Sequence, residues 1–141
     1  MKDYTVETRW IASPGGRMKL LVLTPITNAK SPQKTPGILW IHGGGYVTGM
    51  AEMIYMSRSA DLVKKYGAVV ITPEYRLAGK AAYPAALQDC YAALLYLKEN
   101  AVSLGCNPAK LMVGGESAGG GLTAALCLYA RDRGEVNIAF Q

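Results

Sequence analysis

The sequence predicts an α/β fold in which helices cover both faces of a mostly parallel sheet, with an antiparallel hairpin at its N-terminal end. Three short, continuous apolar runs are typical of strands buried on both faces: residues 37–41, 68–72 and 111–114. Segments with helical spacing of apolar residues separate these runs, and such alternation predicts right-handed crossovers between parallel strands. Half of the 141 residues are apolar and 18% are charged, which is the composition of a globular protein. We therefore expect a single three-layer domain within residues 1–141.

The first part of the chain predicts the hairpin. Residues 3–12 are rich in β-branched and aromatic side chains, and residues 18–24 form a second apolar run. The turn signal Ser-Pro-Gly-Gly at 13–16 separates the two runs, which is typical of an antiparallel pair. Residues 28–36 are mostly polar, contain two prolines, and predict a loop.

Three helices and one further strand complete the expected order. Residues 52–66 carry apolar side chains at helical spacing and are followed by Gly67 as a C-cap. Residues 84–105 predict a second helix, with a proline at its first position. A third helix follows the last buried strand and ends at Gly134, and residues 136–140 resemble the opening of one more strand.

Charge and hydropathy argue against a nucleic-acid partner and against a membrane-spanning helix. The formal net charge of +5 is scattered along the chain, without the basic stripe and interleaved aromatics of a nucleic-acid-binding protein. The N-terminus lacks the apolar region of a signal peptide, and no apolar run approaches the ~20 residues of a membrane helix. We expect a soluble cytoplasmic protein with no nucleic-acid partner and no membrane span.

The cysteines predict neither a disulfide framework nor a metal site. Cys90, Cys106 and Cys127 are an odd number and contain no Cys-x-x-Cys pair. Free thiols in a reducing compartment explain them, and none has a neighbouring histidine that would activate it. No metal and no cofactor are predicted.

A serine motif follows the third buried run directly. In Gly115-Glu116-Ser117-Ala118-Gly119 the serine lies where a strand turns sharply into a helix, which is the setting of a nucleophile elbow. Glycines two residues before and after the serine remove side chains that would collide across such a turn. The helix N-terminus then directs its amides and its positive dipole end to the same place. Ser117 is the candidate catalytic nucleophile.

A glycine-rich loop follows the first buried run. His42-Gly43-Gly44-Gly45 would allow backbone amides to approach a substrate oxygen, and with the amide of Ala118 they could form an oxyanion hole. A phosphate cradle is the competing interpretation, but the dinucleotide fingerprint would require glycine at the position of Thr48. The ester-hydrolase interpretation is favoured because it explains both glycine motifs.

His42 is the only histidine of the chain, and it precedes the serine. In this kind of catalytic site the chain order is serine, then acid, then histidine. We therefore expect His42 to support the glycine loop through hydrogen bonds rather than to act as the general base.

These motifs together resemble the hormone-sensitive-lipase-like branch of the α/β-hydrolases, which contains carboxylesterases and lipases. The resemblance rests on His-Gly-Gly-Gly-Tyr at 42–46 and Gly-Glu-Ser-Ala-Gly-Gly at 115–120. Tyr-Arg-Leu-Ala at 75–78 and Tyr-Pro-Ala-Ala at 83–86 match further stretches typical of that branch. The likeness extends from about residue 3 to the last residue.

The resemblance implies a serine hydrolase of short-chain acyl esters, similar to acetyl esterases. Ser117 would attack the ester carbonyl to form an acyl-enzyme, while loop amides and the amide of Ala118 hold the oxyanion. Tyr75, Arg76 and Asp89 match positions that look structural in the family, and Glu116 would support the elbow in a similar way. The implied partner is a small-molecule ester.

The sequence departs from the family pattern in ways that limit what can be carried over. Gly79-Lys80 replaces the usual Pro-Glu, and the N-terminal segment that commonly forms a cap is almost absent, so substrate size is not implied. After the serine the only acidic residues are Asp132 and Glu135, which we expect to be solvated. The resemblance thus implies an N-terminal part of a hydrolase domain without its catalytic acid and base.

Such a part would expose a sheet edge and apolar faces, so self-association or strand exchange is expected. A non-catalytic binding or oligomerising module remains an alternative. Amide or formamide hydrolysis on the same machinery is another.

Overall fold

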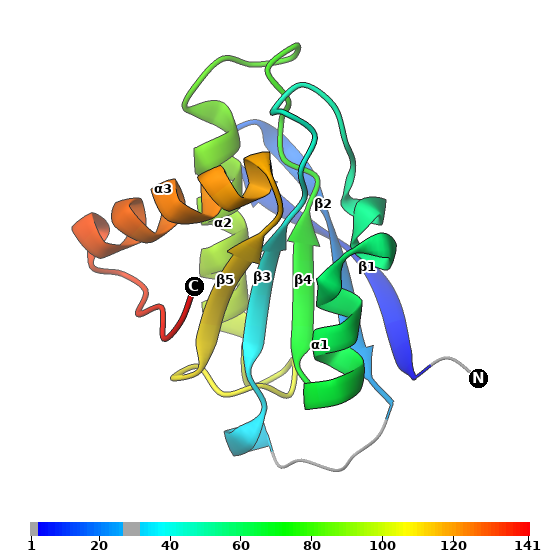
Figure 1. The fold of residues 1–141 in the computed structure, drawn as a ribbon. Helices are drawn as coiled ribbons and strands as arrows, with labels where there is room; N and C mark the ends of the chain where they lie inside the picture. The colour runs from blue at the N-terminus through cyan, green and yellow to red at the C-terminus, as the bar shows by residue number, and fades with distance from the viewer. Residues whose placement is uncertain (1–2, 27–31) are drawn as a thin grey trace.

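A computed structural model describes residues 3–26 and 32–141, and its centre is a five-stranded sheet of order β1-β2-β4-β3-β5 (Figure 1). The strands are β1 (Tyr4–Ser13), β2 (Gly16–Pro25), β3 (Gly37–Ile41), β4 (Val69–Pro73) and β5 (Leu111–Gly115). The hairpin β1–β2 and the pair β2–β4 are antiparallel, whereas β4–β3 and β3–β5 are parallel. The predicted α/β class with an N-terminal antiparallel hairpin is confirmed, and the described sheet is mixed.

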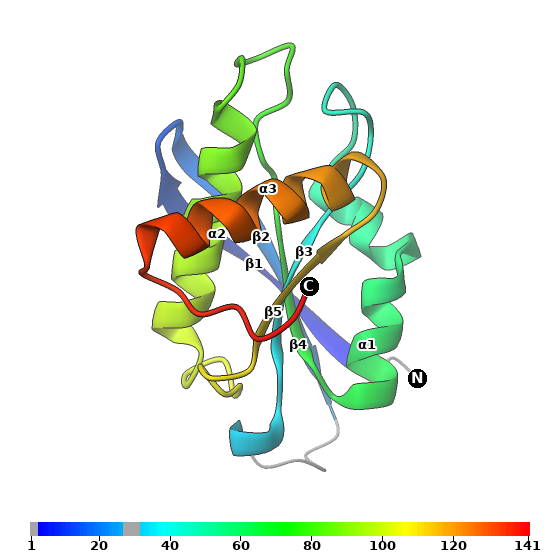
Figure 2. The ribbon, with the colours of Figure 1, turned by 60° about the vertical axis from the view of Figure 1, so that its left-hand side comes forward.

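Helices cover both faces of the sheet and make three layers, as predicted. Helix α1 (Arg58–Tyr66) lies on one face, and α2 (Ala85–Asn100) and α3 (Ala118–Arg133) lie on the other (Figures 1 and 2). Successive strand residues point to opposite faces. Leu39 therefore packs in the core beneath α2 and α3, while Ile38 packs in the core beneath α1.

The helix predicted for residues 52–66 is interrupted, which corrects the sequence interpretation. Residues Ala51–Met56 form a 3₁₀ helix (η2), and α1 begins only after Ser57. Ser57 is extended, and its hydroxyl accepts a hydrogen bond from the Ser59 amide as an N-cap. The cap starts a new helix. Gly67 ends α1 in the left-handed conformation, as predicted.

The other predicted elements lie close to their expected bounds. The expected second helix forms α2 and is followed by turns up to Cys106. The third is α3, capped by Gly134. The predicted loop at 28–36 falls partly outside the described residues, and its described end contains the short 3₁₀ helix η1 (Pro32–Lys34).

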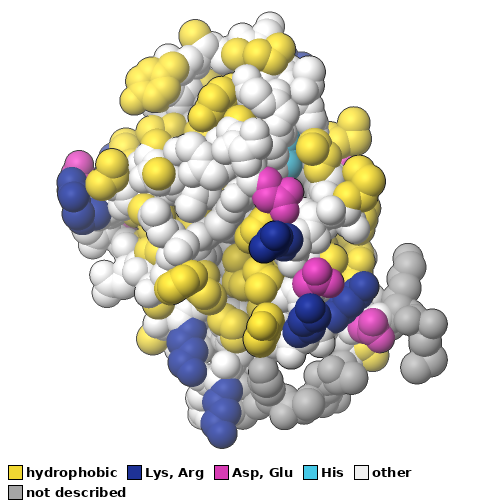
Figure 3. Space-filling view, viewed as in Figure 1, with side chains coloured by type: hydrophobic (Ala, Val, Ile, Leu, Met, Phe, Trp, Pro, Cys, Tyr) yellow, Lys and Arg dark blue, Asp and Glu magenta, His cyan; other side chains and the backbone are white. Residues whose placement is uncertain are grey.

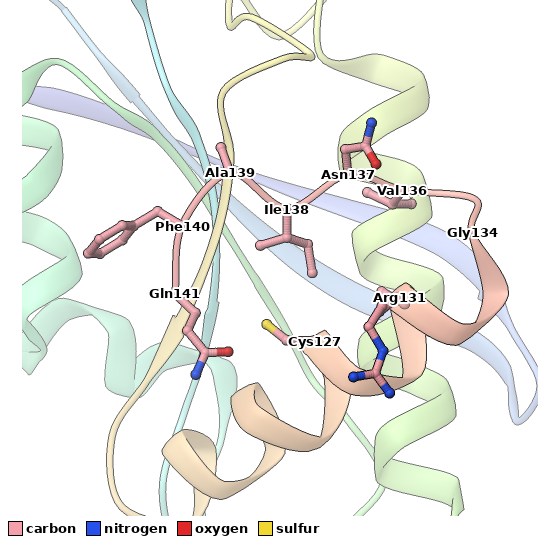
Figure 4. Close-up of a pocket in the computed structure, with 10 residues that line it drawn as sticks. Cys127, Arg131, Gly134, Val136, Asn137, Ile138, Ala139, Phe140 and Gln141 are labelled. Carbon is pink, nitrogen blue, oxygen red and sulfur yellow. The ribbon is translucent and has the colours of Figure 1, made fainter.

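The segment after α3 pairs with β5 at one point only. A single parallel bridge joins Met112 and Phe140, with hydrogen bonds from the Val113 amide to the Phe140 carbonyl and from the Ala139 amide to the Leu111 carbonyl. Around this bridge Ile138 points toward Cys127 of α3, and Phe140 points to the opposite side (Figure 4). Residues 136–139 have no regular secondary structure, so the expected strand over 136–140 is not formed and this one bridge lies in its place.

Hollows flank this bridge on both faces of the sheet. On the α3 side a cavity of about 590 Å³ lies among residues that include Cys127, Val136 and Phe140. On the α1 side an apolar groove is lined by Ile38, Trp40, Leu62, Tyr66, Met112 and Phe140. Figure 3 shows hydrophobic side chains open to view over β3 and β5 beside α1. The chain therefore leaves apolar surface uncovered beside β5.

Candidate active site

The elbow between β5 and α3 holds Ser117 in a conformation that side chains rarely adopt. Its φ is 53° and its ψ is −120°, and it is one of two non-glycine residues with positive φ in the described part of the chain. Such angles cost of order 1–3 kcal/mol and persist only where the surroundings impose them. The serine is exposed and its hydroxyl makes no hydrogen bond to the described residues.

Close backbone packing imposes this conformation. A Cβ at Gly119 would lie 2.7 Å from the His42 carbonyl oxygen and nearer still to that of Ile41. A Cβ at Gly115 would lie 2.7 Å from the Ile41 carbonyl oxygen and would also meet Gly119. The first turn of α3 therefore rests directly on the end of β3, and only glycine fits at both positions.

The glycine loop follows β3, the strand next to β5, and touches the elbow. A Cβ at Gly43 would lie 3.4 Å from the Ser117 Cβ and 2.9 Å from the Glu116 carbonyl oxygen. Gly44 has a φ of 122°, and its carbonyl accepts hydrogen bonds from the amides of Val47 and Thr48. This tight turn folds the loop back beside the serine.

Several amides around the serine have no acceptor among the described residues. The amides of Gly119 and Gly120 donate to the carbonyls of Glu116 and Ser117. No such bond is made by the amide of Ala118, nor by those of residues 43–45. An unpaired amide is a donor available to a ligand.

His42 is held beneath the loop. It is only 3% exposed, and Figure 3 shows it as a small patch. Its Nδ1 lies 2.7 Å from the Gly43 carbonyl oxygen, and its ring stacks on Tyr75 with 4.2 Å between centroids. The Tyr75 hydroxyl donates to the His42 carbonyl at 2.8 Å, and burial raises the pKa of Tyr75, which keeps this donor protonated. No hydrogen bond joins His42 and Ser117.

Tyr46 is a part of the site that sequence reasoning did not single out. Its φ is 65°, and its hydroxyl lies so close to α3 that a Cβ at Gly121 would collide with it. Its carbonyl accepts a hydrogen bond from the Ala78 amide at 2.8 Å. Tyr46 therefore connects the glycine loop to α3 and to the loop after β4. An aromatic residue directly after the glycines was the available signal.

The residues expected to be structural do make structural contacts. The Arg76 guanidinium forms two hydrogen bonds of 2.9 Å with the buried Asp89 carboxylate, which also accepts from the Arg76 amide at 2.9 Å. Glu116 accepts a hydrogen bond from the Arg58 amide, the first of α1, at 3.2 Å. These contacts fix the loop after β4 and the elbow to neighbouring helices.

A second ion-pair cluster anchors the far end of the glycine loop. Lys19 of β2 donates to Glu52 at 2.7 Å and lies 3.3 Å from Glu74, whose carboxylate accepts from the Ala51 amide. The hydrogen bond from Lys19 lowers the pKa of Glu52. Nothing in the local sequence pattern predicted this cluster, because its members come from three separate segments.

The acidic residues after the serine lie at the surface, as expected. Asp132 and Glu135 are exposed and pair with the neighbouring Arg131 and Arg133. The three cysteines are free thiols. Among the described residues there is no cluster of side chains suited to a metal ion. None of the helices in that part of the chain is long and apolar enough to cross a bilayer.

A serine on a strained strand–helix turn, beside a glycine loop at the carboxyl edge of a three-layer sheet, is the arrangement of an α/β-hydrolase. The chain belongs to the family described as alpha/beta hydrolase fold, whose sequence profile matches residues 38–141. This confirms both the resemblance and the α/β-hydrolase type of fold.

Individual relatives agree with this family. The chain is 38% identical over 106 residues to the carboxylesterase NlhH of Mycobacterium tuberculosis, covering 75% of this chain and 33% of that protein. A bacterial heroin esterase superposes with a TM-score of 0.89 and 38% identity, over 99% of this chain and 43% of that one. The esterase of the archaeon Pyrobaculum calidifontis superposes with a TM-score of 0.85 and 36% identity, over 95% of this chain and 41% of that one. The chain thus spans a third of NlhH and less than half of either esterase.

Proposed function

We propose that this chain carries the nucleophile and oxyanion hole of a serine carboxylic-ester hydrolase that acts on short-chain acyl esters. The observation that carries the proposal is Ser117, exposed at a φ of 53° with the glycine loop against it. The names of the relatives support ester hydrolysis, since NlhH is a carboxylesterase and both superposed structures are esterases. Amide or formamide hydrolysis would use the same groups and differs only in substrate.

In this proposal the Ser117 hydroxyl attacks the ester carbonyl, and the alcohol leaves from the resulting tetrahedral intermediate to give an acyl-enzyme. The amide of Ala118 and those of Gly43, Gly44 and Gly45 receive the oxyanion. These amides have no acceptor in the described part of the chain, which supports this role. One oxyanion donor typically contributes about 3 kcal/mol to stabilising the transition state.

We infer that His42 supports the loop and that the proton of Ser117 is taken by a base from outside this chain. The Nδ1 of His42 faces the Gly43 carbonyl, and the His42 ring is stacked on Tyr75. No hydrogen bond joins His42 to Ser117. The exposed acids at the end of α3 are paired with arginines and do not suit a catalytic role. Without its base, such a serine retains only the part of catalysis due to binding and the oxyanion hole, some 10³–10⁴-fold over water.

The test measures hydrolysis of p-nitrophenyl acetate and formation of an acetyl adduct on Ser117. We expect the 141-residue chain to be slow, and a chimera completed with the remaining part of the Pyrobaculum calidifontis esterase to be fast. Ser117→Ala should abolish both the turnover and the adduct. Rapid, serine-dependent turnover by the chain alone would show that the base is present. A folded chimera without turnover would refute the hydrolase.

A non-catalytic oligomerising module is the second candidate, and the apolar groove beside β5 favours it. Ile38, Trp40 and Met112 line this groove on the α1 side of the sheet. Burial of such a surface against a second copy would remove apolar area from water. We expect concentration-dependent association by analytical ultracentrifugation, weakened by Met112→Lys. A monomer at all concentrations with cooperative unfolding would contradict it.

A further inference from the structure

We propose that an apolar pocket between the glycine loop and α3 receives an uncharged, apolar part of the ester substrate; this inference rests on the proposed function. The pocket has a volume of about 370 Å³, which lies within the usual range of ligand sites, about 300–1,000 Å³. Most of its lining comes from the loop after β4, from the start of α2 and from the first two turns of α3. Four alanines share its wall: Ala78, Ala81, Ala86 and Ala125.

Gly121 and Tyr46 relate the pocket to the candidate site. Gly121, which lines it, follows Ser117 by four residues on α3, so it lies on the same side of the helix about one turn, or 5.4 Å, along the axis. Tyr46 also lines the pocket and belongs to the segment that carries the proposed oxyanion amides. A substrate whose carbonyl lies at Ser117 could therefore extend along α3 into the pocket.

The chemistry of the wall selects a neutral group. Arg76 is the only charged residue of the lining, and its Nε and Nη2 both donate to Asp89. A Cβ at Gly15 would lie 2.5 Å from the Arg76 Nε, so the guanidinium packs toward the hairpin turn. Its charge is neutralised, and the wall offers no other ionic partner to a charged substrate group.

Small side chains make the space, and aromatic rings border it. An alanine leaves room that a larger residue would fill, whereas Tyr46 and Tyr83 are 43% and 87% exposed beside the opening. Exposed aromatic rings at a concave apolar site commonly contact a ligand. The pocket therefore suits a linear or flat hydrocarbon group, from either the acyl or the alcohol side of the ester.

Amide chemical-shift titration of the 141-residue chain tests the inference directly, with hexanamide for the acyl side and hexan-1-ol for the alcohol side. We expect shifts at Gly121 and Ala125 with at least one probe. Ala125→Phe should fill the pocket and raise the Kd about tenfold, which corresponds to about 1.4 kcal/mol. Ala124→Phe is the matched control, since Ala124 is the neighbouring exposed residue of α3 and does not line the pocket.

The outcomes separate this inference from the proposed function. Equal Kd values for Ala124→Phe and Ala125→Phe would overturn the inference that this pocket binds the probes. Chemical-shift changes centred on the groove around Trp40 would do the same. Hydrolysis of p-nitrophenyl hexanoate unchanged by Ala125→Phe would overturn it too and leave the hydrolase standing. Binding at the pocket without any acylation of Ser117 in the completed chimera would refute the hydrolase instead. The pocket would then remain a site for neutral apolar ligands.

Discussion

Replacing one of two adjacent glycines at the start of α3 tests whether the helix rests on β3 as tightly as the structure shows. In Gly119→Ala the new methyl group would lie 2.7 Å from the His42 carbonyl oxygen and closer to the Ile41 carbonyl oxygen. In Gly120→Ala the nearest atom, the Gly115 carbonyl oxygen, lies at 3.5 Å, an ordinary contact. Neither glycine has a positive φ, so alanine is not strained by backbone angle at either position.

The expected difference follows from these distances. Alanine instead of glycine within a helix stabilises by about 0.5–1 kcal/mol, and this gain applies to both variants. At position 119 the obstacles are backbone atoms that cannot rotate away, so α3 and β3 must separate by roughly 1 Å, which costs about 1–3 kcal/mol or more. Gly120→Ala should therefore be neutral or stabilising, while Gly119→Ala should be clearly destabilising.

Urea unfolding followed by circular dichroism measures both variants under the same conditions. We expect the urea midpoint to fall for Gly119→Ala and to stay or rise for Gly120→Ala, with similar m-values, because the strain affects only the native state. If Gly119→Ala were as stable as Gly120→Ala, the contact between α3 and the end of β3 would not be rigid. The packing explanation for the conformation of Ser117 would then be wrong.

Three further predictions concern buried polar or ionisable groups. Tyr75→Phe should lower the free energy of unfolding by about 1–3 kcal/mol in urea titrations, because it removes the hydroxyl that donates to the buried His42 carbonyl. Tyr83→Phe, at an exposed position, should change the free energy of unfolding little. Asp89→Asn should lower the free energy of unfolding, measured by urea titration, by about 2–4 kcal/mol, because it removes the buried charge that Arg76 binds. The exposed Asp132→Asn should lower it by less than about 0.5 kcal/mol. Equal losses in the two variants would contradict this prediction. Burial raises the pKa of Cys106 from 9.0 to about 11, so between these values the unfolded state loses a proton that the native state keeps. Stability should fall by up to about 2–3 kcal/mol as the pH rises through that window, and a Cys106→Ala variant with the same slope would refute this origin.

The strands β3, β4 and β5 were predictable because each is a short apolar run next to turn signals. The run at 37–41 became β3 with the same bounds, since Pro36 precedes it and the glycine loop follows it. The break at Ser57 was missed, although serine is a good N-cap. Apolar spacing alone cannot separate a 3₁₀ turn from the α-helix that follows it.

The candidate site was predictable in its parts but not in its contacts. The two glycine motifs marked Ser117 and the loop correctly as neighbours, because the carboxyl ends of parallel strands lie along one edge of a sheet. The stacking of His42 on Tyr75 and the position of Tyr46 against Gly121 join segments far apart in the chain. Such contacts depend on the order of strands, which local patterns do not reveal. The roles of these residues in catalysis stay predictions.

The order of strands explains how the site is held together. β4, β3 and β5 are consecutive in the sheet, and each is followed by a segment that contributes residues to the site. Tyr75 after β4 supports His42 after β3, whose loop in turn contacts Ser117 after β5. Every one of these contacts is made within this chain and none needs a general base. The amides proposed for the oxyanion are therefore already in place before any proton transfer, which is the preorganisation that makes such donors effective. Under the proposed function, binding of the oxyanion and activation of the serine are thus physically separate tasks, and the contacts in this chain would serve the first.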